Sequence, residues 1–259
     1  MYLAELSFKI IADTNFDQAE AAIRRYIEAL IFNGQVLGRE FPTAWQQDRF
    51  NSRVVLPAED ALQQPYHSQR GNTALDQLAS AGLAYPQWQI LGMDLMSSHT
   101  DPCLNSDYYI LYSRFNETCS PLRCGEHFAP VPLYKLSALT DDHEQLIRWQ
   151  LQYQALDEIQ MQQNRVLHKS AERSLQQLNS KLNQQGRALA RRIERISLTP
   201  VFYALYSGSS DNCATEAGKN CPGCSGDWRL SQPLHGIFDF KCVSCRLISN
   251  IAWDCQSPS

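Results

Sequence analysis

Two Cys-x-x-Cys pairs near the end of the chain constrain its fold more than any other feature. Cys221-Pro-Gly-Cys224 and Cys242-Val-Ser-Cys245 are separated by 17 residues, a spacing typical of four-cysteine zinc sites. Each turn brings two sulfur atoms close enough to hold one ion, and two turns supply the four thiolates that suit tetrahedral Zn²⁺. We therefore predict one Zn²⁺ bound by Cys221, Cys224, Cys242 and Cys245. Because four cysteines leave no position for water, such a site is structural rather than catalytic.

Short strand-like runs lie between and after the two pairs, in the order expected for a zinc ribbon. These runs are DWRL, GIFDFK and RLISNIAW. So small a unit buries little apolar surface, and the metal replaces the missing core, to which we expect Trp228, Phe238, Phe240 and Trp253 to contribute. A rubredoxin-type iron site uses the same four thiolates and stays open as an alternative. A thioredoxin-like redox pair is disfavoured, because neither pair lies between a strand and a helix.

The beginning of the chain and its cysteine content predict a cytoplasmic protein. The first residues, MYLAELSFKIIADTNF, contain neither a basic segment nor a small-residue cleavage site. No apolar run approaches the roughly 20 residues that span a bilayer, so we expect no membrane association. Nine cysteines in a reducing compartment indicate metal or redox sites rather than disulfides. Cys213 and Cys255, which flank the ribbon, are expected to be small buried side chains or, alternatively, spare ligands.

Residues 1–136 are predicted to form an α+β domain. Polar and apolar residues alternate over residues 3–11, which predicts a strand. Apolar residues recur at three- and four-residue spacing over 13–32, which predicts a helix capped by Asp13, Thr14 or Asn15. A second helix is expected at 72–82, and further strands at 34–41, 50–57, 88–96 and 107–115. The order β-α-β-β-α-β-β predicts one ferredoxin-like antiparallel sheet with helices on one face.

Residues 137–199 are predicted to form a helical segment, and residues 200–259 a C-terminal strand followed by the zinc ribbon. Asp141-Asp142 can cap a first helix, and Asn179 or Ser180 a second helix near 180–196. TPVFYALYS, which follows the second helix, is expected to be a strand.

A second group of metal-binding residue types lies in a proline-rich connection. Cys124 and His127, three residues apart, can ligate one metal, and Cys119 could be a third ligand. Burial of these side chains in a loop is the alternative. A Cys-His nucleophile would make the protein an enzyme, but no glycine-rich oxyanion loop or ordered triad accompanies the pair. The sequence therefore favours a non-enzymatic role, and no catalytic or cofactor-binding residue is assigned.

Positive charge is concentrated in the predicted second helix. Residues 164–195 contain eight Lys or Arg and two Glu, although the whole chain has a net charge of −4. Arg187, Arg191 and Arg195 share one helix face, and Arg192 lies beside them. With Arg229 of the ribbon, they are candidates for contacts to the phosphates of DNA or RNA. The alternatives are a solvated helix face and a protein-interaction or scaffold module that binds another protein.

The chain resembles a family of bacterial proteins that are described as zinc-ribbon-containing and as candidate nucleic-acid-binding proteins. The resemblance rests on MYLAELSFKI, APVPLYKL, TPVFYALY and CPGC…FDFKCVSCRLISNIAW, and it covers nearly the full length. It implies Zn²⁺ at the four ribbon cysteines. Nucleic-acid binding in that family is itself inferred from the ribbon.

Overall fold

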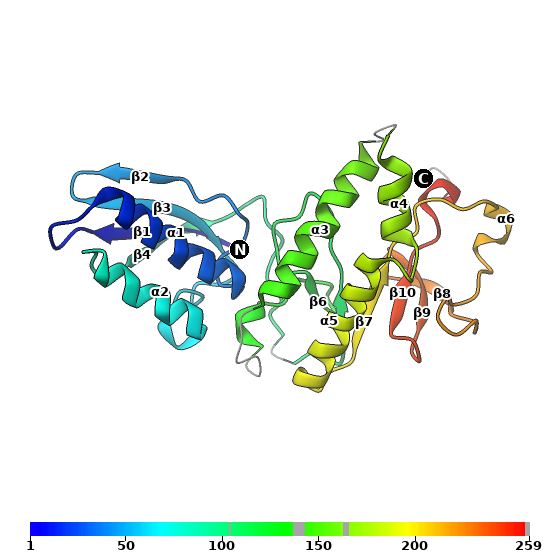
Figure 1. The fold of residues 1–259 in the computed structure, drawn as a ribbon. Helices are drawn as coiled ribbons and strands as arrows, with labels where there is room; N and C mark the ends of the chain where they lie inside the picture. The colour runs from blue at the N-terminus through cyan, green and yellow to red at the C-terminus, as the bar shows by residue number, and fades with distance from the viewer. Residues whose placement is uncertain (104, 137–142, 163–165, 257–259) are drawn as a thin grey trace. The chain divides into compact units, whose positions relative to one another are not determined.

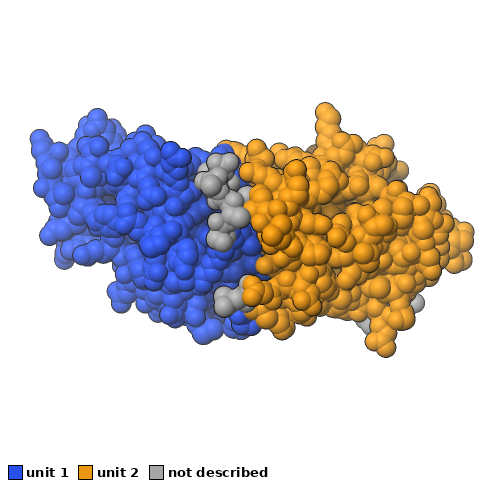
Figure 2. Space-filling view, turned by 90° about the horizontal axis from the view of Figure 1, so that it is seen from below, with its two compact units in different colours: residues 1–102, 118–120, 129–144 blue, residues 103–117, 121–128, 145–259 orange. Residues whose placement is uncertain are grey.

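The chain folds into two compact units of mixed α+β structure, in a computed structural model that describes residues 1–103, 105–136, 143–162 and 166–256 (Figure 1). Unit 1 comprises residues 1–102, 118–120 and 129–144, and unit 2 comprises residues 103–117, 121–128 and 145–259 (Figure 2). The chain therefore passes between the units several times. These bounds differ from the three segments predicted with boundaries at residues 136 and 199.

Unit 1 is built on a four-stranded antiparallel sheet with the strand order β2-β3-β1-β4. Its strands are β1 (Tyr2–Lys9), β2 (Thr43–Gln46), β3 (Arg49–Leu56) and β4 (Gln87–Met93). Its helices are α1 (Phe16–Phe32) and α2 (Gln69–Ser80), with short 3-10 helices η1 (Gln64–Tyr66) and η2 (Leu133–Lys135). The chain order β1-α1-β2-β3-α2-β4 is the β-α-β-β-α-β order on which the ferredoxin-like prediction rests.

The sheet of unit 1 buries one face because its sequence alternates. Leu6 and Phe8 of β1 are fully buried, and they belong to the same apolar core as Ile27 of α1 and Leu78 of α2. α1 begins where Asn15 accepts a hydrogen bond from the N–H of Gln18, so one of the three predicted caps is confirmed.

The predicted strand at 34–41 is wrong. The backbone at Gly34 and Gly38 has left-handed φ angles of 73° and 81°, which interrupt an extended strand. Leu37 makes only an isolated bridge to Val55 of β3, and β2 follows at residues 43–46.

Unit 2 contains a six-stranded mixed sheet with the order β6-β5-β7-β10-β9-β8. Its strands are β5 (Tyr109–Leu111), β6 (Leu122–Cys124), β7 (Val201–Leu205), β8 (Arg229–Leu234), β9 (Phe238–Cys242) and β10 (Leu247–Ser249). β7 pairs in parallel with both β5 and β10, and the other neighbours are antiparallel. The strand predicted at 107–115 therefore belongs to this sheet and not to the N-terminal one. The C-terminal strands extend the same sheet, so they do not form an isolated domain.

Three long helices lie beside the sheet of unit 2 (Figure 1). They are α3 (Glu144–Met161), which belongs to the unit from Gln145 onward, α4 (His168–Gln176) and α5 (Lys181–Ser197). α6 (Cys213–Glu216) and the 3-10 helix η3 (Trp253–Cys255) are short. The sequence predicted two helices here, whereas the structure forms a separate α4. Ser180 caps α5 as predicted, and Asp141-Asp142 lies outside the described residues.

Gly186 allows α5 to pack closely against unit 2's largest buried aromatic residues. A Cβ atom at this position would lie 2.7 Å from Nε1 of Trp149 and would also meet Tyr203 of β7. Trp149 Nε1 donates to the carbonyl oxygen of Leu182, 3.2 Å away, one turn before Gly186. The absence of a side chain at Gly186 therefore allows the short distance between α5 and the rings of Trp149 and Tyr203.

None of the helices that the structure describes is both long enough and apolar enough to cross a membrane.

Candidate metal centre and basic helix

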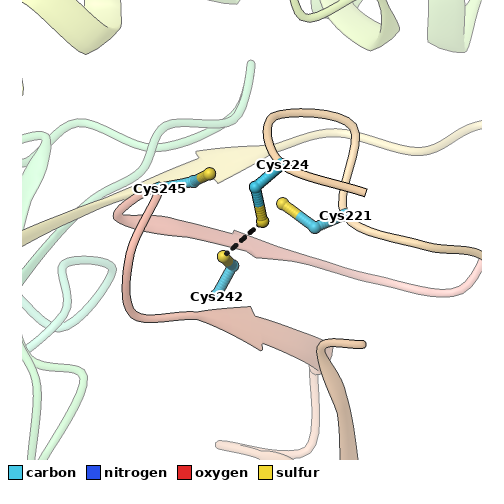
Figure 3. Close-up of side chains that lie close together, drawn as sticks. All are labelled: Cys221, Cys224, Cys242 and Cys245. Atoms are coloured by element: carbon cyan, nitrogen blue, oxygen red, sulfur yellow. Dashed lines mark hydrogen bonds between the residues drawn. The ribbon is translucent and has the colours of Figure 1, made fainter. Parts of the chain in front are cut away.

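The four predicted ligands meet at one point in unit 2. The Sγ atoms of Cys221, Cys224, Cys242 and Cys245 all lie within 4.8 Å of one another. Figure 3 shows the four side chains converging from two segments: the loop before β8 carries the first pair, and the second pair lies at the end of β9 (Cys242) and in the turn before β10 (Cys245). The separation of Cys224 Sγ and Cys242 Sγ is 3.7 Å. The sequence therefore identified a group of four thiols that could hold one metal ion.

The two turns share a backbone feature that is not evident from their sequences. Ser225 and Arg246 each follow the second cysteine of a pair, and their φ angles are 59° and 53°. Both therefore adopt the left-handed conformation that usually favours glycine. In the first turn, the N–H of Ser225 donates to the carbonyl oxygen of Cys221 over 2.8 Å. The chain thus folds back after each pair, and this aims both sulfur atoms of a pair at the same point.

Gly223 lies where the two turns approach each other. A Cβ atom at this position would lie 2.7 Å from Cys245 Sγ, so any larger residue would push the second pair away. The N–H of Gly223 also points toward Cys221 Sγ, 3.4 Å away.

The thiols of the four-cysteine centre differ in pKa. Hydrogen bonding from the backbone of Gly226, together with contacts to Ser244 and neighbouring cysteines, lowers the pKa of Cys224 to about 6. Desolvation and the neighbouring thiols raise the pKa of Cys245 to about 12. Four crowded sulfur atoms therefore cannot all ionise on their own, and a cation at their centre would remove this restriction.

The apolar residues beside the centre divide into two groups. Trp228 is buried, stacks on Phe240 at a centroid distance of 5.0 Å and donates its Nε1–H to the carbonyl oxygen of Lys219. Phe238 is also buried. Trp253, in contrast, is 51% exposed, so its predicted place in the ribbon core is wrong. It lies in η3 beyond β10, where it does not enter the sheet.

Cys213 and Cys255 form a disulfide, which corrects both expectations for them. They are neither separate buried side chains nor spare ligands of the four-cysteine centre. Cys213 begins α6 and Cys255 ends η3, and their Cα atoms lie 5.1 Å apart, a distance that a disulfide spans. The sequence offered only an odd number of cysteines, from which this pairing does not follow.

The residues of the predicted second metal site lie in different units. Cys119 belongs to unit 1, whereas Cys124 and His127 belong to unit 2. Cys124 Sγ lies 3.6 Å from His127 Nδ1, and Cys103 Sγ lies 3.4 Å from the same nitrogen. Within unit 2 the histidine therefore has two thiol neighbours, of which Cys103 was not among the predicted ligands.

The environment of Cys124 does not favour a nucleophile. Its thiol donates to Glu126 Oε2 over 2.8 Å, and desolvation together with this hydrogen bond raises its pKa to about 11. Ser106 and the N–H of Asp107 also donate to the Glu126 carboxylate, and the pKa of Glu126 falls to about 2 although desolvation opposes this. At neutral pH Cys124 is therefore a thiol, which lacks the reactivity of a thiolate.

Four of the five predicted arginines lie on α5, which precedes the four-cysteine segment in the chain. Arg191 and Arg195 are exposed, and Arg187 is half-buried. Arg187, Arg191 and Arg195 form no ion pair with any of the described residues. Arg192 donates to Gln145 Oε1 of α3 over 3.3 Å. The exposed pair, four residues apart, therefore provides free positive charge on one helix face.

Arg229 is a weaker candidate for phosphate binding. Its guanidinium lies 3.4 Å from Asp239 and 5.0 Å from the centre of the Phe240 ring. Both contacts hold the side chain against β9, so part of its charge is already compensated.

Models of three families match successive parts of the chain. Residues 1–92, 103–206 and 210–255 match, in that order, domains of unknown function DUF8589, DUF2310 and DUF8594. The last match contains all four cysteines of the centre. Among solved structures, a "Putative antibiotic biosynthesis monooxygenase from Nitrosomonas europaea" covers 36% of this chain and 98% of its own, with 17% identity and a TM-score of 0.27. A likeness at this level supports no inference.

Two relatives from Haemophilus influenzae are similar in sequence, and each is described only as "Uncharacterized protein". One is 34% identical over 177 residues, which is 68% of this chain and 87% of the relative. The other is 33% identical over 263 aligned positions, which cover 98% of this chain and 99% of the relative. Because this match runs through both proteins almost from end to end, the chain belongs to the same family as this Haemophilus influenzae protein.

Proposed function

We propose that the four-cysteine centre is a zinc ribbon holding one structural Zn²⁺, and that the protein binds nucleic acid through the neighbouring arginines of α5. The convergence of four sulfur atoms within 4.8 Å carries the metal proposal. In a tetrahedron with Zn–S distances of about 2.3 Å, the sulfur atoms lie about 3.8 Å apart. The 3.7 Å between Cys224 Sγ and Cys242 Sγ matches this spacing.

Metal analysis of the purified protein tests the first half of the proposal. We expect about one zinc per chain. Cys242→Ser should abolish binding, whereas Cys103→Ser is the matched control, because this exposed thiol lies outside the centre. Iron in place of zinc would overturn the metal assignment, and no metal would overturn the ribbon.

Unpaired positive charge on α5 supports the second half of the proposal. Arg191 and Arg195 lie about 6 Å apart along the helix axis, since each residue rises about 1.5 Å. A guanidinium presents several donors in one plane and suits phosphate oxygens. The bidentate pair between Arg246 and Glu194 joins the second cysteine turn to α5. This pair connects the second cysteine turn to the helix that carries the arginines, which supports a combined role for the two.

Binding to duplex DNA, single-stranded DNA and RNA over a salt series tests this half. Each phosphate contact contributes a slope of about −0.9 in log K against log salt for duplex DNA and about −0.7 for single strands. The double variant Arg191→Ala/Arg195→Ala should weaken binding. It should also make the slope of log K against log salt shallower by the amount that about two phosphate contacts contribute. Arg24→Ala/Arg25→Ala on α1 is the matched control, because it removes the same charge from unit 1. No binding at low salt, or equal losses in both variants, would contradict the proposal.

Protein interaction is the second candidate function, and one observation favours it. Val243, in the turn of the second cysteine pair, is 61% exposed. An apolar residue on a metal-stiffened turn can anchor a protein partner. A partner that is retained by Arg191→Ala/Arg195→Ala and lost in Val243→Asp would favour this function over nucleic-acid binding.

A further inference from the structure

A large cavity lies within unit 2, away from the four cysteines. Its volume is about 560 Å³, within the range of small-molecule sites. The segment after β5, α3, β7 and the start of β9 line it. The walls are rich in rings: Tyr112, Phe115, Tyr153, Tyr206, Phe238 and Trp253. Such walls favour a flat ligand that can stack.

Two buried polar atoms of residues that line this cavity lack hydrogen-bond partners among the described residues. Ser113 is 3% exposed, and its Oγ has no hydrogen-bond partner among the described residues. The same is true of the buried Oε1 atom of Gln160. A buried polar atom without a partner is destabilising, so a rotation of these side chains toward a bound ligand would be favoured by the hydrogen bonds that they now lack.

Asp157 adds a buried carboxyl group to the same wall. Its Oδ2 accepts the N–H of Phe115 over 2.9 Å, and the side chain forms no ion pair with any of the described residues. Burial raises the pKa of this carboxyl group, although the N–H of Phe115 and the charge of Arg114 oppose the shift. A ligand that donates two hydrogen bonds, or that carries a positive charge, would compensate this group.

Much of the rim of the cavity is apolar, although the exposed Arg114 also lines it. Phe115, Met161 and Trp253 are 41%, 57% and 51% exposed, and all three line the cavity. Large apolar side chains at an opening are typical of a binding site, since they bury further surface when a ligand enters.

We propose that this cavity binds a planar nitrogen heterocycle whose N–H groups donate to Asp157, Ser113 and Gln160. The carboxylate of Asp157, with two oxygen atoms, selects an edge with adjacent N–H groups, as in a 2-amino-substituted ring. The aromatic walls favour a flat ligand, and the volume of the cavity is large enough for a ring system with one substituent. This site is independent of both the zinc centre and the arginines of α5.

Titration with 2-aminobenzimidazole tests the proposal, because this compound is planar and presents adjacent N–H donors. Calorimetry with the metal-loaded full chain should give saturable binding at one site. Indole, which has a similar shape but a single N–H, should bind at least tenfold more weakly. No binding up to the solubility limit, or equal binding of both compounds, would overturn the proposal.

Variants locate the binding in the cavity. Asp157→Asn keeps an acceptor for the N–H of Phe115 but loses the charge, and it should weaken binding at least tenfold. Ser113→Ala should weaken it severalfold, and Trp253→Ala, a change at the exposed rim, should weaken it without disturbing the fold. Arg191→Ala/Arg195→Ala is the control and should bind as the unaltered chain does. Unchanged binding in both Asp157→Asn and Trp253→Ala would place the compound elsewhere and contradict the proposal.

Discussion

Arg246 and Glu194 join the second cysteine turn to α5. The Nε and Nη2 atoms of Arg246 donate to the Glu194 carboxylate over 3.2–3.3 Å, and the N–H of Val201 donates to Glu194 Oε2 over 3.0 Å. One carboxylate therefore links the metal centre, the basic helix and the first residue of β7. Although desolvation opposes the shift, the hydrogen bonds from Val201 and Arg246 lower the pKa of Glu194.

Glu194→Gln should destabilise unit 2 by about 1 kcal/mol at pH 7, because the hydrogen bonds lose their charge and the pair is partly exposed. A lowered pKa in the folded protein means that the stabilisation is present above the ordinary value of Glu. It is lost as pH falls through the folded-state pKa. Unfolding by denaturant at pH 7 and at pH 3 measures the difference in stability between the variant and the unaltered chain. This difference should be smaller at pH 3. Glu20→Gln, which removes an exposed pair with Arg24, should have a smaller effect, and equal effects would contradict the prediction.

Removing the proposed zinc ion should open the C-terminal strands but not unit 1. Because β10 pairs with β7, the loss should extend from the cysteine turns into the six-stranded sheet. Hydrogen exchange before and after chelation measures this. We expect amides of β9 and β10 to lose protection and those of β1 and β3 to keep it. Unchanged protection of β9 in the chelated protein would show that the metal does not hold this region.

Ser225→Gly should stabilise the metal-loaded protein by up to about 1 kcal/mol. Ser225 has a φ of 59°, and a left-handed conformation costs a non-glycine residue about 1–2 kcal/mol. The entropy of glycine in the unfolded chain offsets part of this gain. Ser231→Gly in the exposed strand β8 is the control, where glycine should destabilise instead. Thermal melts distinguish the two variants, because the melting temperature should rise for Ser225→Gly and fall for Ser231→Gly.

Gly186→Ala should destabilise unit 2 by about 1–3 kcal/mol, the usual cost of overpacking. The new methyl group would meet Trp149 and Tyr203, so either α5 or both rings must move. Gly218→Ala is the control, since a Cβ atom there meets only the carbonyl oxygen of Thr215 at 3.7 Å. Denaturant melts of both variants should show a loss for Gly186→Ala alone.

Asp157→Asn should stabilise the ligand-free protein at pH 7. Burial raises the pKa of this carboxyl group, so the folded state favours its protonated form. Stability is then greatest below the ordinary value of 3.8 and falls as pH rises toward the folded-state pKa. Arg114 and Glu117 are the charged groups that face it and act in opposite directions. Thermal melts should show a gain for the variant at pH 7 that disappears near pH 4, and a loss at pH 7 would contradict the expectation.

Local patterns predicted the parts of the fold that depend on nearest neighbours. The alternation of β1, the cap at Asn15 and the two cysteine turns are encoded within a few residues of each other. Sheet membership is not encoded in this way. β5 pairs in parallel with β7 about 90 residues later, and periodicity shows only that both are strands.

In the candidate site, too, the features encoded by local sequence were predicted and those that depend on distant residues were not. Spacing identified four thiols, because Cys-x-x-Cys is a local signal. The disulfide between Cys213 and Cys255 joins residues 42 positions apart, and the exposure of Trp253 depends on where η3 leaves the sheet. The cavity could not be predicted either, since its walls come from segments that are far apart in the sequence.

The disulfide encloses the whole four-cysteine segment in a covalent ring. If the ion is removed, the ends of this ring remain tied, so the four sulfur atoms stay at a high local concentration. A chain-entropy estimate for a 42-residue loop gives about 4 kcal/mol of restriction on the unfolded segment. For the proposed metal-bound state, loss of the ion would therefore be a reversible opening within a covalent tether, and the two cysteine turns could close again when metal returns.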